Sequence, residues 1–138
     1  MQKDEWKNDS EYREIVSDLM ATDMVKKLAN YTQHHHSTRL EHSIAVSFDS
    51  YKIAKRRGLD YRAVARAGLL GSHAFIHPRV ALRNAERITK LSPMEKDIIL
   101  KHMWGLTLAR PKYEESVIVS LVDDYEAVHE FVSPLKSK

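Results

Sequence analysis

Apolar side chains recur every three to four residues along most of this chain, and almost no segment alternates apolar and polar residues. A spacing near 3.6 residues is typical of helices that bury one face, whereas strands have a period of two. With four Gly and four Pro in 138 residues, few positions interrupt such helices. The sequence therefore predicts an all-α protein, folded as one domain over residues 1–138 because this length suits a single core.

Helix start signals divide the chain into segments. Thr38 with Glu41, and Ser92 with Glu95, have the spacing of a capping box, and Pro78 suits a first helical turn. The helices predicted from these signals and from the apolar spacing start at Ser10, at Thr22 or Asp23, at Thr38, after Asp60, at Pro78, near residue 93 and after Pro111. The third ends at Gly58, the fifth at Ile88, and the last is closed by Ser133-Pro134.

Charge and cysteine content exclude several classes of protein. The formal charge is +3, and basic residues are mixed with acidic ones, so nothing supports nucleic-acid binding. With no cysteine the chain has no disulfide, thiolate zinc site or cysteine nucleophile. No apolar run approaches the roughly 20 residues of a membrane span, and none resembles a signal peptide. We therefore expect a cytoplasmic protein without membrane contact.

Eight histidines make a metal site worth testing. His42 falls inside a predicted helix, His73 and His77 flank the start of the Pro78 helix, and His102 ends an apolar run. His34 begins a run of three, for which a solvated loop is the simpler interpretation because adjacent side chains seldom converge on one ion. Each histidine alone could equally be a hydrogen-bonded residue of a core or a cap.

Asp123 is the least expected carboxylate, because it follows a mostly apolar run in the segment VIVSLVDDY of a predicted core helix. A buried carboxylate without a partner is costly, so a cation or a hydrogen-bond donor should accompany it. Three histidines and one carboxylate are a ligand set that zinc, nickel or cobalt accepts.

Five segments of the chain resemble successive parts of the HD-domain superfamily: STRLEHSIAV, YRAVARAGLL, HPRVALRNAERI, IILKHMW and SVIVSLVDDYEAV. The resemblance covers about residues 33–131 and is closest to small bacterial members. These proteins are all-α, metal-dependent phosphohydrolases with the pattern H…HD…D, often with two further histidines. The resemblance implies an HD-domain-like helical bundle.

Carried over by position, the resemblance implies metal ligands at His42, His77, His102 and Asp123. Asp124 is the alternative register for the last ligand, and His34 and His73 are neighbours of the site. The implied activity is hydrolysis of a phosphate ester or nucleotide by a metal-bound hydroxide, with Mn, Fe, Zn, Ni or Co as the divalent ion. Arg39 or Arg79 could bind the phosphate, and no catalytic residue is assigned.

The pattern breaks after AGLL, where the family has its His-Asp pair and a following loop but this chain has Gly71-Ser72. In the family that pair holds two ions close together. We therefore expect impaired turnover, with a metal weakly bound or absent. The alternative is a non-catalytic or redesigned helical scaffold that binds a small ligand.

Three explanations of the gap stay open: an engineered loop deletion closed by Gly-Ser, which we favour, a natural degenerate member, or a loop that the molecule contains and the sequence omits. Asp49 lies two helical turns after His42, and Glu126 one turn after Asp123. These two carboxylates could form a new site in place of the lost pair, or could simply face water.

Overall fold

The computed structural model describes residues 4–33, 37–71, 77–102 and 110–136. Over these ranges the chain is helical, as the sequence predicts, apart from one antiparallel pair of two-residue strands in which Thr32 pairs with Thr38. The elements are η1 (Glu5–Asn8), α1 (Ser10–Met20), α2 (Asp23–Lys27), η2 (Leu28–Asn30), β1 (Thr32–Gln33), β2 (Ser37–Thr38), α3 (Arg39–Arg56), α4 (Tyr61–Gly71), α5 (Pro78–Glu86), α6 (Pro93–Lys101) and α8 (Glu114–Lys136).

Side-chain caps fix most helix starts. At α3, Thr38 Oγ1 accepts from the Glu41 amide and Glu41 Oε1 accepts from the Thr38 amide, both at 3.0 Å. Ser92 and Glu95 make the same reciprocal pair at α6. Both predicted capping boxes are therefore confirmed. They satisfy amides that the first helical turn leaves without a partner.

Some predicted helix ends and caps differ from the structure. Helix α1 begins at Ser10 as predicted, but its cap is Asp9, whose Oδ1 accepts from the Tyr12 amide at 3.0 Å, and not Ser10. Helix α3 ends at Arg56, two residues before the predicted Gly58. Helix α5 ends at Glu86 because the Ile88 amide bonds three residues back, to Ala85, and so tightens the last turn. Helix α8 passes Pro134 and ends at Lys136. Proline lacks one backbone donor, and losing one bond does not end a helix of 23 residues.

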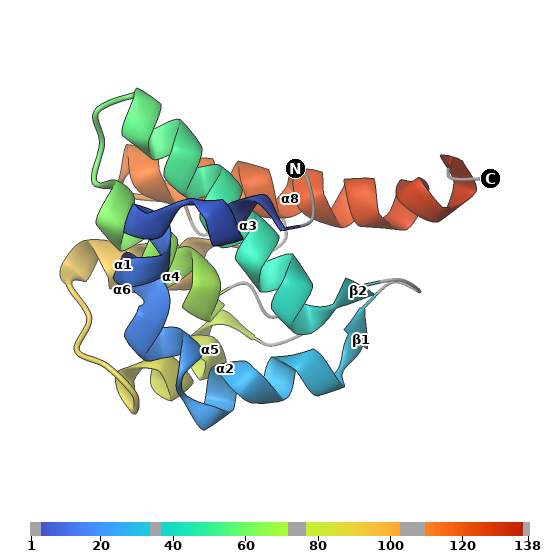
Figure 1. Cartoon of the computed structure of the whole chain (residues 1–138). Coiled ribbons are helices and arrows are strands. Elements are labelled where there is room, and N and C mark those ends of the chain that lie inside the picture. The colour runs from blue at the N-terminus through green and yellow to red at the C-terminus, as the bar shows by residue number, and fades with distance from the viewer. Residues whose placement is uncertain (1–3, 34–36, 72–76, 103–109, 137–138) are drawn as a thin grey trace.

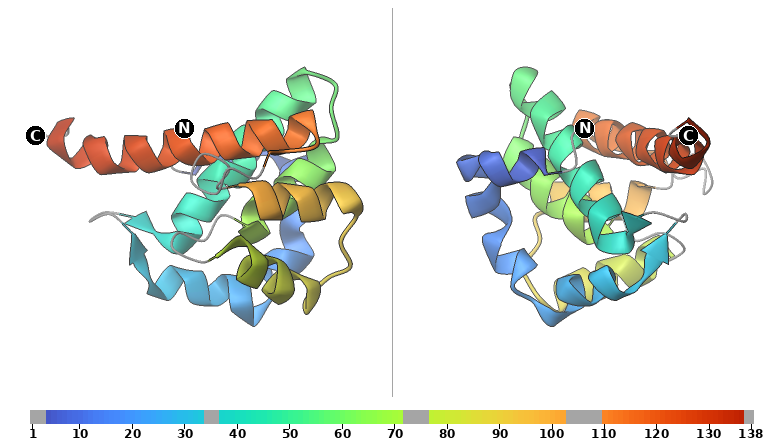
Figure 2. Two further views of the ribbon diagram at one scale, coloured as in Figure 1. Left: turned by 180° about the vertical axis from the view of Figure 1, so that it is seen from behind. Right: turned by 45° about the vertical axis from the view of Figure 1, so that its right-hand side comes forward.

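Helix α3 lies at the centre of the fold (Figure 1), packed against α4 and α8, while α4 and α8 both also pack on α6. Arg57, just after α3, makes an ion pair with Glu114 at the start of α8, and His42 near the start of α3 reaches Asp123 further along α8. The two helices therefore run antiparallel. The last turns of α8 extend beyond the rest of the ribbon in Figure 1 and in the left view of Figure 2.

Helices α3 and α4 approach closely because small residues line their contact. A methyl group on Gly68 would lie 3.2 Å from Cα of Ser47, tighter than ordinary packing. The Ser47 hydroxyl donates to the Ala65 carbonyl at 2.6 Å and accepts from the buried Tyr12 hydroxyl at 2.8 Å. Tyr12, Phe48 and Tyr51 then form an aromatic cluster on this core.

The segment where the resemblance predicts a gap lies at the edge of a described range. Gly71 is the last residue of α4, and Ser72 and His73 fall outside the described residues, so the continuity of the chain across the gap stays untested. No helix in the described part of the chain has the length and apolar character needed to cross a membrane.

Candidate functional site

His42 on α3 and Asp123 on α8, 81 residues apart in the sequence, meet at the contact between these helices. Nε2 of His42 lies 2.7 Å from Oδ1 of Asp123, and the two side chains are 2% and 15% exposed. A carboxylate can only accept, so Nε2 carries the proton and donates it. Two of the four predicted metal ligands are therefore joined by a hydrogen bond shielded from solvent.

His102 caps the C-terminal end of α6 and is also buried. Its Nδ1 lies 2.6 Å from the Ile99 carbonyl, which can only accept. The neutral ring then keeps its lone pair on Nε2, the tautomer that metal-binding histidines use when a backbone carbonyl orients them. The hydroxyl of Ser120, one turn before Asp123, donates to the His102 carbonyl at 3.2 Å and so joins this end of α6 to α8.

The end of α4 lies beside the same segment of α6. A methyl group at Gly71 would sit 3.3 Å from Cα of Ile99, the residue whose carbonyl orients His102. The predicted resemblance aligns Gly71 with the histidine of the family's His-Asp pair. The predicted position of that pair is therefore close to one predicted ligand.

His77 is exposed and caps the start of α5, where its Nδ1 accepts from the Arg79 amide at 3.1 Å. This bond uses the lone pair of a neutral ring and leaves the proton on Nε2, the opposite arrangement to that of His102. Arg79 is exposed beside it. Arg39 begins α3, half-buried, with its guanidinium 5.3 Å from the centre of the Tyr31 ring.

Asp49 and Glu126 line one pocket between α3 and α8, with a volume of about 440 Å³. Glu126 is buried, and Oδ1 of Asp49 lies 3.8 Å from Nζ of Lys52. The pocket thus brings together the two carboxylates predicted as a replacement site. Their ligand role stays a prediction, as does that of His34, which lies outside the described residues.

Asp124, the alternative last ligand, is exposed at the edge of this region. Partial burial of its carboxyl raises the pKa above its usual value, and the charge of Asp123 raises it further, while His102 acts in the opposite direction.

These residues have the chemistry of a metal site but not its arrangement. Among the described residues, no three His, Asp or Glu side chains are placed to hold one ion. His42 and Asp123 bond to each other, and His77 uses its lone pair in a helix cap. A metal bound at Nε2 requires the proton of the neutral ring on Nδ1. Among the three predicted histidine ligands, only His102 has its proton there. The described residues as arranged do not fit a bound ion.

Sequence reasoning missed two buried charged groups. Arg66 on α4 makes two bonds to Asp18, at 2.7 and 3.0 Å, and a third to the Ile15 carbonyl. Asp97 on α6 accepts from Ser116 of α8 at 2.6 Å and from Lys101 at 2.9 Å. Their partners lie far away in the sequence, except for Lys101 four residues on. The spacing of Asp97 and Lys101, four residues apart on one helix face, was the one signal in the sequence that could have revealed either buried charge.

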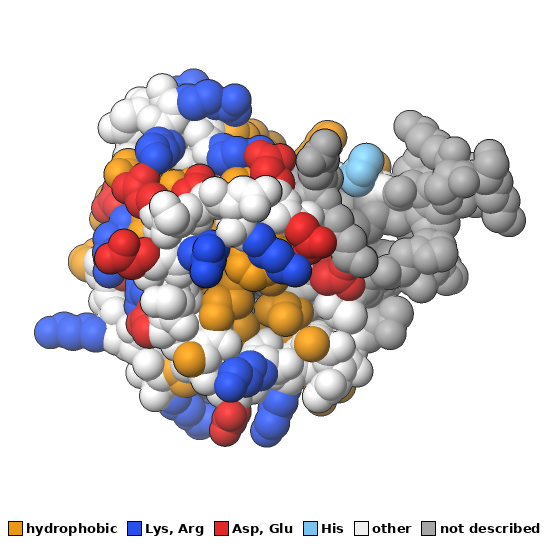
Figure 3. Space-filling model, in the orientation of Figure 1, with side chains coloured by type: hydrophobic (Ala, Val, Ile, Leu, Met, Phe, Trp, Pro, Cys, Tyr) orange, Lys and Arg blue, Asp and Glu red, His pale blue; other side chains and the backbone are white. Residues whose placement is uncertain are grey.

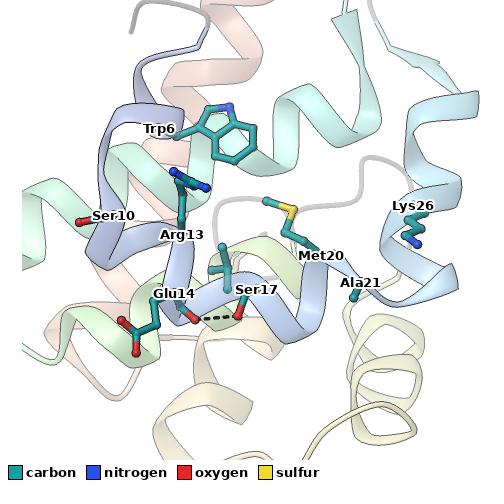
Figure 4. A pocket seen from close by; sticks show the side chains of 9 residues that line it. Trp6, Ser10, Arg13, Glu14, Ser17, Met20, Ala21 and Lys26 are labelled. Carbon is teal, nitrogen blue, oxygen red and sulfur yellow. Dashed lines mark hydrogen bonds between the residues drawn. The ribbon is translucent and has the colours of Figure 1, made fainter.

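A second, wider pocket of about 670 Å³ lies between η1, α1 and α2. Figure 3 shows apolar side chains exposed on this face between Lys and Arg side chains. In Figure 4, Trp6 and Met20 lie around the pocket, Arg13 stands close to Trp6, and Glu14 points away. None of the site residues predicted from the sequence lines this pocket.

Comparison of the chain with protein-family models, with curated proteins and with solved structures finds no match. The all-α class is established by the fold itself. The HD-domain relationship stays a prediction.

Proposed function

We propose that this chain is a helical scaffold of the HD-domain phosphohydrolase type, cytoplasmic, whose action on phosphate esters or nucleotides is impaired because the His-Asp pair is missing. The contact between His42 and Asp123 supports this proposal most strongly. Those two residues, chosen by motif position at opposite ends of the pattern, lie 2.7 Å apart in the fold.

The surroundings of His102 give independent support. Its Nδ1 is held by the Ile99 carbonyl, and Gly71 packs on the same residue. A Cβ at position 71 would lie 3.3 Å from Cα of Ile99, three residues before His102 on the same helix. This proximity supports the end of α4 as the place of the pair that the sequence lacks.

Restoring the pair tests the proposal. We expect the chain purified without added metal to hold less than about one tenth of an equivalent of metal and to show no turnover of a generic phosphate monoester with Mn²⁺. The variant carrying Gly71→His and Ser72→Asp should bind close to one equivalent of Mn²⁺ or Zn²⁺, and its melting temperature should rise when either ion is added.

Gly71→Ala with Ser72→Ala is the matched control, because it places the same Cβ against Ile99 without adding ligands. Adding His42→Ala to the restored variant should remove the gain in metal binding. A restored variant that folds but binds no more metal than the alanine control contradicts the relationship to the HD-domain type. Substantial metal and turnover in the unaltered chain would contradict the impairment instead.

The pocket between η1, α1 and α2 favours a second candidate function, the binding of a small ligand without catalysis. Its volume falls in the usual range for ligand sites, and its apolar side chains lie near Arg13 and Lys26. This chemistry suits a ligand with an apolar body and an anionic group. Fluorescence titration with anilinonaphthalene sulfonate should show saturable binding that Met20→Glu abolishes, with Lys27→Glu, a residue that does not line the pocket, as the control.

A further inference from the structure

The pocket of about 440 Å³ between α3 and α8 is lined by charged side chains of both signs. Helix α3 contributes Asp49, Lys52 and Arg56, and helix α8 contributes Glu126. Two acidic and two basic groups give the wall no net formal charge. The volume falls in the usual range for small-molecule sites. The pocket is therefore a candidate ligand site whose wall balances its own charges.

The rest of the wall is apolar and incompletely covered. Leu121 and Tyr125 of α8 are 56% and 63% exposed, two of the five large hydrophobic side chains that the described part of the chain leaves exposed. Ile53 of α3, partly buried against the core, lines the same pocket. The Tyr125 ring stacks on His129, with ring centres 5.9 Å apart and an angle of 9° between the planes. A ligand with an apolar body would cover these side chains and gain the free energy of burying them.

The two carboxylates of the wall suit a cationic group. Glu126 is 4% exposed, and a carboxylate buried to this extent is stabilised by positive charge close to it. Within the described residues, Asp49 has one ion pair, to Lys52 at 3.8 Å, which is too long for a hydrogen bond. Its oxygens can therefore accept hydrogen bonds from an ammonium group of a ligand.

The two basic side chains of the wall differ in how far they are already paired. Nζ of Lys52 donates to Oε1 of Glu5 at 2.9 Å and lies 4.9 Å from the centre of the Phe48 ring. The exposed side chain of Arg56 has no hydrogen bond or ion pair with any other residue that the structure describes. A guanidinium binds a carboxylate through two parallel hydrogen bonds, so Arg56 suits an anionic group of the ligand.

The spacing of the charges on α3 limits the length of the ligand. Asp49 and Arg56 are seven residues apart, which is about 10 Å along the helix axis. Helical side chains lean towards the N-terminus of their helix, so that of Arg56 leans towards Asp49. A hydrogen bond of about 2.8 Å at each end then leaves only a short separation between the two charged groups of the ligand. An α-amino acid, with its ammonium on the carbon next to the carboxylate, fits this separation.

The presence of both signs of charge selects the class of ligand. A bare divalent ion would meet Lys52 and Arg56, and an anion alone would meet Asp49 and Glu126, in each case at a cost. A zwitterion places an opposite charge against each pair.

We propose that this pocket binds a free α-amino acid with an apolar side chain. Its ammonium bonds to Asp49 and Glu126, its carboxylate bonds to Arg56, and its side chain covers Leu121 and Tyr125. The inference does not depend on the proposed function, because it needs neither a metal nor the missing His-Asp pair. It competes with the hypothesis of a replacement metal site, because the same two carboxylates cannot bind an ion and an ammonium at once.

Isothermal titration calorimetry of the full chain with L-phenylalanine tests the site. We expect saturable binding of one molecule per chain. Phenethylamine lacks the carboxylate and hydrocinnamate lacks the ammonium, so each should bind at least about tenfold more weakly, because a charged group of the pocket loses its partner. The isomers norleucine and ε-aminocaproate test the spacing. The second has its charges further apart and should also bind at least about tenfold more weakly than the first.

Two variants separate the charged contacts. Arg56→Gln should weaken phenylalanine binding at least about tenfold and leave phenethylamine unchanged, because only phenylalanine has a carboxylate. Asp49→Asn should weaken both of these ligands and should not weaken hydrocinnamate. Arg62→Gln, at an exposed arginine of α4 outside the pocket, is the control and should change none of the three. Far-ultraviolet circular dichroism checks that each variant keeps its helices.

Three results would overturn the site. The first is that phenylalanine, leucine and norleucine all fail to bind saturably at about 10 mM, a concentration that detects millimolar affinity. The second is phenethylamine binding as tightly as phenylalanine, which would indicate a site for cations alone. The third is binding that both Arg56→Gln and Asp49→Asn leave intact, which would place the ligand elsewhere. These titrations contain no metal, so their outcome is separate from that of the restored His-Asp variant.

Discussion

The contacts that α3 makes with α4 and with α8 differ in the kinds of side chain they contain. Towards α4 the contact is made of small residues, and the Ser47 hydroxyl bonds to both of its neighbours. Towards α8 it contains a buried histidine and carboxylates around a pocket. The comparison indicates that the first contact supplies stability and the second tolerates residues suited to chemistry. The predictions below test this division, from the largest expected effect to the smallest.

Gly68→Leu should lower the free energy of unfolding by about 3 kcal/mol, because a side chain there meets the backbone of Ser47. Urea unfolding followed by circular dichroism measures the change. Arg62→Leu on the exposed side of the same helix is the control and should change stability by less than about 0.5 kcal/mol. An unaltered midpoint for Gly68→Leu would show that the α3–α4 contact is not tightly packed.

Ser47→Ala should cost about 2 kcal/mol, because it leaves the buried Tyr12 hydroxyl without its acceptor. Burial also raises the pKa of Tyr12, so the group is a neutral hydroxyl at physiological pH. Tyr12→Phe in the Ser47→Ala background should therefore cost much less than Tyr12→Phe in the native chain. Strictly additive costs in chemical unfolding would rule out this coupling.

Asp97→Asn tests how α8 is anchored, and we expect a loss of about 1.5 kcal/mol at neutral pH. Burial raises the pKa of the Asp97 carboxyl, but hydrogen bonds from Ser116, Lys101 and the Lys112 amide outweigh burial and lower the pKa below 3.8. A lowered folded-state pKa stabilises the fold above the unfolded-state value and loses that effect as pH falls through the folded-state pKa.

The stability difference between the native chain and Asp97→Asn should accordingly shrink on acidification below pH 3.8. Urea unfolding at a series of pH values measures it. A difference that stays constant over this acidic range would mean that Asp97 is not ionised in the folded protein.

The smallest effect is expected at the candidate site itself. A double-mutant cycle of His42→Asn and Asp123→Asn should give a coupling energy of about 1 kcal/mol, because the pair is hydrogen-bonded and shielded from solvent. Thermal unfolding without added metal measures all four proteins. A coupling of zero would show that the two residues do not meet in solution, and would remove the main support for the proposed function.

Local signals predicted the helices well, and contacts distant in sequence were missed. Thr38 and Ser92 were identified because their partners lie three residues away. The Arg66–Asp18 pair and the Asp97–Ser116 bond join residues 48 and 19 positions apart, and no periodicity reveals which helices meet. Asp123 was singled out because it follows an apolar run, but its pairing with His42 as a ligand came only from the predicted family resemblance, since spacing does not show which helices meet.

The predicted site could not be read in full from the sequence because tautomers depend on tertiary contacts. His42, His77 and His102 were equivalent as predicted ligands. A carboxylate and an amide place the proton of His42 and His77 on Nε2, whereas a carbonyl places that of His102 on Nδ1. Likewise the apolar residues of α8 were predicted to lie in a core. Its inner face is buried, whereas Leu121, Tyr125 and Val128 form an exposed face.

The central position of α3 has a consequence for hydrogen exchange. Residues 42–48 of this helix are all buried, because α4 and α8 cover it from different sides. Amides enclosed in this way exchange only when the whole domain opens, whereas those of helices packed on one side also exchange through local openings. Deuterium uptake by this stretch should therefore report global stability directly, and its protection should fall by the full amount that Gly68→Leu removes.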